Sequence, residues 1–204
     1  ILDRLQVGAS VWIDDGHIGA TVESIASEGV RLKITHARSK GEKIRPDKGL
    51  NFPDTRLRLS SLTDKDRKDL DFVATHADMI GYSFVQEIAD IVLLQQELKT
   101  RLGDRAFLPA IVAKIETPEA IRNLPELIIY AAGKQPLGVM IARGDLAVEI
   151  GYQRLAEMQE EILWLCEAAH VPVIWATQVL ENLVKKGIPS RSEEHFWEVE
   201  SIQS

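Results

Sequence analysis

The chain has 204 residues, of which 45% are hydrophobic and 27% are charged, as in ordinary globular proteins. These proportions exclude a disordered chain, a collagen and a coiled-coil rod. The formal net charge is −7, so we expect no general attraction to nucleic acid or to an anionic membrane. The single cysteine, Cys166, excludes an internal disulfide and is typical of a reducing, cytoplasmic compartment.

Residues 1–58 have the pattern of short strands joined by tight turns. Hydrophobic residues alternate with other residues in three segments, and the turn sequences Asp14-Asp15-Gly16 and Ser27-Glu28-Gly29 separate these segments. The alternating segments are residues 11–13, 18–22 and 30–34. Loop residues dominate the remainder, so the pattern predicts a small β-rich domain over residues 1–58.

From residue 59 onward, apolar strands alternate with amphipathic helices, and Thr63 with Asp66 resembles the capping box that begins a helix. The predicted strands cover residues 79–84, 110–115, 137–142 and 173–176. The predicted helices cover residues 88–98, 119–130, 155–169 and 178–186. Repeated β-α units predict an α/β fold with a parallel sheet or a (β/α)8 barrel. About four units are present, so we expect a partial (β/α)8 TIM-type barrel over residues 59–193 and a separate tail over 194–204.

Polar residues follow the carboxyl ends of these strands, where both folds bind ligands. Lys114 and Glu116 lie two residues apart, so they face the same side of their strand. Asp145 follows the next strand, and together with Glu116 it is suited to hold one hard divalent cation such as Mg²⁺. Gly144 and Asp145 lie where a helix begins, and free backbone N–H groups there attract a carboxylate or a phosphate. Thr177 follows the last predicted strand and offers a hydroxyl.

Each of these features also has an ordinary structural interpretation. Lys114 and Glu116 alone would be an ion pair at the barrel mouth, and Thr177 alone would be a helix cap. Residues 143–145 alone would be a turn with a helix cap, and residues 14–16 are most simply a hairpin turn. The shared location of the first three features on successive strand ends favours one common site.

Several segments resemble pyruvate kinase in their order and spacing. Four lie in the predicted barrel: residues 111–116, 139–150, 173–181 and 189–193. Residues 11–16 and 48–53 resemble the β-rich lid domain of that family, and residues 59–66 resemble the return into its barrel. The resemblance extends from about Val7 to Glu193, and it implies a lid domain joined to a catalytic barrel.

The resemblance also implies a role for each candidate residue. Lys114 would stabilise the transferred phosphoryl group and the enolate, and Glu116 with Asp145 would hold Mg²⁺ or Mn²⁺. The backbone of Gly144 and Asp145, with the side chain of Thr177, would hold the pyruvate carboxylate, and Thr177 would lie near the proton given to the enolate. Two lid residues would approach the nucleotide, namely Asp15 and Lys48.

The sequence also departs from the family pattern. The three barrel strands that precede the lid in the family are absent, and these carry an arginine for the phosphate and the ligands of a monovalent cation such as K⁺. The eighth strand, expected after Glu193, is also absent, and the first residue is Ile1 rather than Met, so we expect a piece of a longer chain or a processed one. Gln86 stands where the family usually has Arg, and Ala147 where it usually has Gly.

Three hypotheses follow from this comparison. The first is a glycolytic phosphotransferase that converts phosphoenolpyruvate and ADP to pyruvate and ATP, as a cytoplasmic homo-oligomer. The second is a catalytically incomplete relative that binds metal and small keto acids, or a partner chain, without turnover. The third is a metal-dependent aldolase on a similar barrel, against which residues 1–58 argue because an aldolase needs no nucleotide lid.

Overall fold

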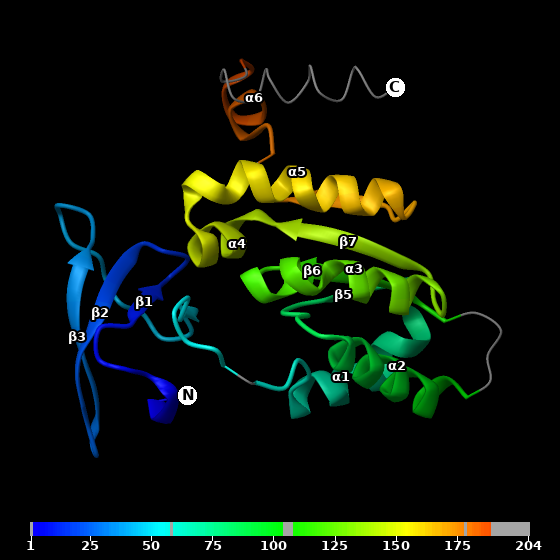
Figure 1. Cartoon of the computed structure of the whole chain (residues 1–204), viewed down its shortest axis with the longest axis horizontal. Coiled ribbons are helices and arrows are strands. Elements are labelled where there is room, and N and C mark those ends of the chain that lie inside the picture. The colour runs from blue at the N-terminus through cyan, green and yellow to red at the C-terminus, as the bar shows by residue number, and fades with distance from the viewer. Residues whose placement is uncertain (1, 58, 104–107, 178, 189–204) are drawn as a thin grey trace.

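The structure, a computed structural model, describes residues 2–57, 59–103, 108–177 and 179–188. A small antiparallel sheet and a larger unit of parallel strands and helices lie side by side in Figure 1. Two segments interpreted from the sequence lie outside the described residues: 189–193 and the tail 194–204. The two sheets fall on either side of the expected boundary between residues 58 and 59, and the domain limits themselves stay a prediction.

The small sheet consists of four antiparallel strands in the order β3-β2-β1-β4, preceded by a short 3-10 helix, η1 (Leu2–Arg4). Its strands are β1 (Ser10–Ile13), β2 (Ile18–Ala26), β3 (Gly29–His36) and β4 (Leu50–Asn51). The β1–β2 turn has left-handed φ values at Asp14, Asp15 and Gly16, of 56°, 53° and 83°, so the predicted hairpin is confirmed. The sequence did not predict β4, because two residues carry no alternation to detect.

The larger unit has four parallel strands in the order β5-β6-β7-β8. The strands are β5 (Met79–Tyr82), β6 (Ala110–Ile115), β7 (Leu137–Ala142) and β8 (Val173–Ala176). The last three coincide with the predicted strands, whereas β5 ends two residues early because Phe84 has a left-handed φ of 53°. The sequential order of parallel strands is that of a partial TIM-type barrel, as expected.

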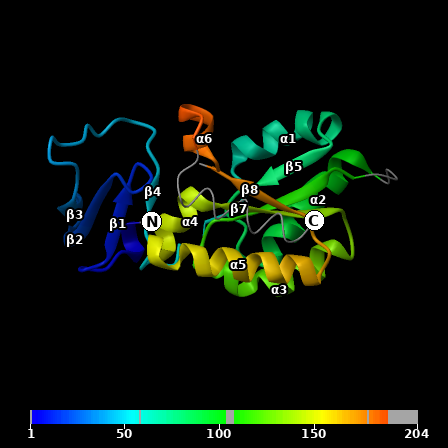
Figure 2. The same ribbon diagram turned by 90° about the horizontal axis from the view of Figure 1, so that it is seen from above.

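Helices connect the strands of this unit. They are α1 (Asp64–His76), α2 (Ile88–Leu102), α3 (Pro118–Ala132), α4 (Arg143–Ile150), α5 (Tyr152–Ala168) and α6 (Glu181–Lys186). The helix predicted over 178–186 begins only at Glu181, because Leu180 before it is left-handed with a φ of 55°. Figure 2 shows α3 and α5 side by side along the strands, and these helices contact each other. None of the described helices is long and apolar enough to cross a membrane.

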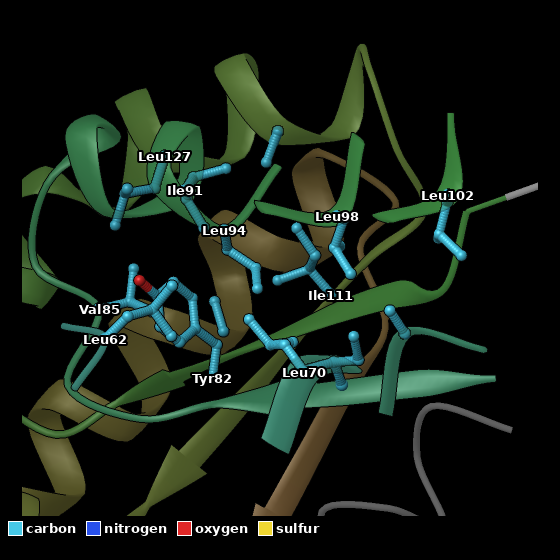
Figure 3. Close-up of a cluster of buried hydrophobic side chains, with 14 residues drawn as sticks. Leu62, Leu70, Tyr82, Val85, Ile91, Leu94, Leu98, Leu102, Ile111 and Leu127 are labelled. Atoms are coloured by element: carbon cyan, nitrogen blue, oxygen red, sulfur yellow. The ribbon is translucent and has the colours of Figure 1, made fainter. Parts of the chain in front are cut away.

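The strands bury the face that the helices cover. Along β6, Ile111, Ala113 and Ile115 are at most 2% exposed and belong to the two hydrophobic clusters of this unit. Figure 3 shows the first cluster, where Leu94 and Leu98 of α2 meet Ile111. Because side chains alternate along a strand, Lys114 projects from the opposite face of β6, the face that lines the inside of a barrel.

The start of α1 provides a test of local stability. The Thr63 hydroxyl accepts a hydrogen bond from the Asp66 backbone N–H at 3.2 Å, and the Asp66 carboxylate accepts one from the Thr63 N–H at 2.8 Å, which confirms the predicted capping box. We expect Thr63→Ala to lower the free energy of unfolding in urea by about 1 kcal/mol. The control Thr100→Ala, at an exposed site on α2, should cost about 0.5 kcal/mol or less, and an equal loss in both variants would contradict the cap's role.

The core of α5 provides a second test. Cys166 is fully buried in the second hydrophobic cluster, and burial raises the pKa of its thiol to about 11. Only about one thiol in a thousand is therefore ionised at pH 8, and the folded chain shields it from reagents. We expect Ellman's reagent to modify Cys166 in the folded protein about a hundredfold or more slowly than in 8 M urea. Equal rates would show that this core opens readily.

Candidate functional site

A buried carboxylate joins the ends of β5 and β6. Glu116 directly follows β6 and is 1% exposed, and its Oε1 lies 2.8 Å from Lys114 Nζ. Its Oε2 accepts a hydrogen bond of 2.5 Å from the backbone N–H of Phe84, beyond the end of β5. Lys114 Nζ also donates to the Ser83 hydroxyl at 2.8 Å. The Lys114 side chain remains 27% exposed, so its ammonium group is held in place yet is partly open to solvent.

The acidic groups of this site influence one another. Burial is the largest cause of the raised pKa of Glu116; Lys114 and the Phe84 N–H oppose this rise, and the negative charge of Asp145 adds to it. Burial also raises the pKa of Asp145, the charge of Asp15 raises it further, and Lys114 lowers it. Asp145 of α4 therefore lies within electrostatic range of Lys114 on β6, of Glu116 directly after β6, and of Asp15 in the β1–β2 hairpin.

The start of α4 and the end of β8 lie together. Because Ala142 of β7 pairs with Ala176 of β8, the residues that follow these strands emerge side by side. A Cβ atom built on Gly144 would lie 3.9 Å from Thr177 Oγ1. The N-cap residue of α4, Ala142, supplies no capping side chain, and the Asp145 carboxylate accepts a hydrogen bond from its own backbone N–H in the first turn. Thr177 itself has a left-handed φ of 63°.

The two residues expected from the lid have different surroundings. Lys48 Nζ lies 2.7 Å from the Asp14 carboxylate, a pairing that the sequence analysis missed. The structural cause of this ion pair is the short β1–β4 pairing, which brings Leu50 opposite Ile13. The negative charge of Asp15, one residue further along the hairpin, raises the pKa of Asp145, which belongs to the larger unit of parallel strands and helices, called the barrel unit below. The structure thus places the charge of Asp15 within electrostatic range of Asp145 and joins Lys48 to the hairpin through Asp14.

Glu116 and Asp145 are the carboxylates of this site that are candidate ligands for a divalent cation. Among the described residues, no group of three or more His, Cys, Asp and Glu side chains is arranged to hold a metal. Glu116 and Asp145 are two carboxylates whose charges disfavour each other, a repulsion that a divalent cation relieves. Mg²⁺ commonly takes one or two carboxylates and completes its shell with water and substrate oxygens. The two residue types suit this ion, and in the structure both Glu116 oxygens already have partners, which the ion would share or displace.

Comparisons with known proteins identify the family of this chain. The family model described as "Pyruvate kinase, barrel domain" matches residues 1–197. A pyruvate kinase of Rattus norvegicus is 33% identical over 188 residues, which are 92% of this chain and 30% of the relative. One of Encephalitozoon cuniculi is 35% identical over 193 residues, covering 94% of this chain and 41% of the relative.

A solved structure gives the same result. The crystal structure of a pyruvate kinase from Cryptosporidium parvum superposes with a TM-score of 0.79 and 30% sequence identity. The match covers 96% of this chain but 39% of that one, so this chain spans well under half the length of its relatives. The segments that suggested the resemblance lie within the matched residues, and the chain belongs to the pyruvate kinase family.

Proposed function

We propose that this chain carries the central part of a pyruvate kinase site, which transfers a phosphoryl group from phosphoenolpyruvate to ADP. The observation that carries the proposal is the Lys114–Glu116 pair at the carboxyl end of β6, within electrostatic range of Asp145. Family membership supports the same reaction. Because the chain spans only part of its relatives, the activity is proposed for the full-length protein that contains it.

Lys114 would stabilise the charge that moves during the transfer. The bond between phosphorus and the enol oxygen of phosphoenolpyruvate breaks, and a bond forms between phosphorus and a β-phosphate oxygen of ADP. The enolate left behind then takes a proton at its methylene carbon and becomes pyruvate. A fixed ammonium group beside these oxygens lowers the barrier, because phosphoryl transfer depends mainly on positioning and charge neutralisation. The bonds to Glu116 and Ser83 would hold that group in position.

The start of α4 would hold the carboxylate of the substrate. The backbone of Gly144 and Asp145 belongs to the first turn of α4, where N–H groups suit a negative group, and the Thr177 hydroxyl lies beside Gly144. The same hydroxyl would lie on the path of the proton to the enolate. This arrangement would fix the orientation of the three-carbon substrate relative to Lys114.

Glu116 and Asp145 would hold Mg²⁺ or Mn²⁺. When bound, such an ion neutralises negative charge on the phosphate and the enolate oxygen. Asp15 and Lys48 would contact the nucleotide, which enters between the small sheet and the barrel unit. A requirement for K⁺ would depend on residues outside this chain. We further propose a cytoplasmic homo-oligomer.

A second candidate function is binding without turnover, and it is favoured by Gln86. This residue, beyond the end of β5, stands where the family usually has Arg. Its backbone N–H donates to Asp90 and its carbonyl accepts from Asn123, so the segment is ordered but its side chain is uncharged. Calorimetry with Mg²⁺, oxalate and ADP, beside a turnover assay, separates the two functions.

Loss of the ammonium group tests the reaction. In the full-length protein with ADP and Mg²⁺, Lys114→Met should lower the rate of pyruvate formation about a hundredfold or more. The variant lacks the ammonium group that neutralises the negative charge of the phosphoryl group and the enolate. Lys68→Met, at an exposed site on α1, is the matched control and should keep the wild-type rate. A wild-type protein without turnover, or a Lys114→Met variant of normal activity, would refute the proposed function.

Loss of one carboxylate tests the metal site without any need for turnover. Asp145→Asn should weaken Mn²⁺ binding about tenfold or more, because it removes one of the two anionic ligands. The binding is measured by the electron paramagnetic resonance of free Mn²⁺. Glu160→Gln, at an exposed position on α5, should bind as the wild type does. Unchanged affinity in Asp145→Asn would place the metal elsewhere.

A further inference from the structure

The short helix α4 connects the candidate site with the small sheet. Its first turn carries Gly144 and Asp145, and its last turn carries Val148 and Glu149. In both Figure 1 and Figure 2, α4 lies at the end of the barrel unit that faces the small sheet. A displacement of the small sheet at the last turn of α4 is therefore transmitted to Asp145 through about one turn of helix.

Two contacts join the small sheet to the last turn of α4. Asn51 of β4, which is 7% exposed, donates a hydrogen bond from Nδ2 to Glu149 Oε1 at 3.0 Å. At the tip of the β1–β2 hairpin, a Cβ atom built on Gly16 would lie 3.3 Å from Val148 Cγ2. Because β1 pairs with both β2 and β4, the two contacts belong to one rigid unit.

The hydrogen bond is the polar part of this junction. Among the described residues, the charged groups that act on Glu149 are Asp145 and Asp54, and both are negative. The Asn51 amide is the described partner that stabilises this half-buried carboxylate. Arg56 also bridges to the barrel unit, through Glu119 at 2.9 Å, but its side chain is 58% exposed. Exposed ion pairs of that kind contribute little to stability.

We propose that Glu149 is a positioning residue that sets the small sheet over the candidate site through Asn51. Asn51 lies three residues after Lys48, so the bond fixes the expected nucleotide-binding side chains, Lys48 and Asp15, relative to Asp145. Glu149 itself contacts neither metal nor substrate. The inference rests on the proposed function for its nucleotide, but the position of the small sheet is measured without turnover.

The test measures the distance between the two units in the full-length protein. Spin labels on Ser27→Cys, in the β2–β3 turn, and Thr100→Cys, on α2, report this distance, and Cys166 is buried away from the reagent. We expect one narrow distance distribution in the wild type. Glu149→Ala should broaden it, whereas Glu149→Gln should keep it narrow because the glutamine oxygen still accepts from Asn51.

Reversing the hydrogen bond tests the pair itself. Asn51→Asp places two carboxylates together and should separate the units. Adding Glu149→Gln to Asn51→Asp restores a bond of the opposite direction, from the glutamine amide to the aspartate, and should restore the narrow distribution. Glu160→Ala, at an exposed position on α5, is the matched control.

The affinity for ADP, measured by calorimetry, provides the second readout. It should fall about tenfold in Glu149→Ala and in Asn51→Asp, because a hydrogen bond to a charged group shifts an equilibrium by about that factor. It should recover in the double variant. A narrow distribution in Glu149→Ala, a failure of the double variant to recover, or no ADP binding by the wild type would overturn the inference. Normal ADP binding without turnover would contradict only the proposed reaction.

Discussion

The carboxylate of Glu116 is the constraint on which the candidate site depends. A charged group that is 1% exposed is costly unless it is fully paired, and here one oxygen meets an ammonium group and the other a backbone N–H. The two bonds hold Lys114 in place and tie the end of β5 to the end of β6. The left-handed backbone at Phe84, which ends β5 early, belongs to the segment that supplies this N–H group.

The parts of the fold that burial determines were predictable from the sequence. The strands β6, β7 and β8 are nearly continuous apolar runs, and their observed limits agree with the expected ones. The capping box at Thr63 was predictable because its two side chains act within four residues. The limits of β5 and α6 were not, because Phe84 and Leu180 adopt left-handed conformations that an apolar pattern does not encode.

The candidate site was predictable in its barrel part and less so in the small sheet. Parallel strands bring their carboxyl ends to one edge, so the proximity of Lys114, Glu116 and Asp145 follows from the strand order alone. The Asp14–Lys48 pair depends on a two-residue strand, and the Asn51–Glu149 bond joins residues that are 98 positions apart. Contacts of this length depend on how the two units dock, which periodicity does not describe. The functional roles and the domain limits stay predictions.

The backbone at Thr177 has an evolutionary consequence. A threonine in the left-handed region is strained by roughly 1–2 kcal/mol, and glycine adopts the same conformation without steric cost. Selection for folding alone would then not retain a branched side chain at this position. A strained threonine whose hydroxyl faces the start of α4 is expected where a chemical role of the hydroxyl outweighs the lost stability. If the chemistry were abandoned in a descendant, this is a position where drift toward glycine would meet little resistance.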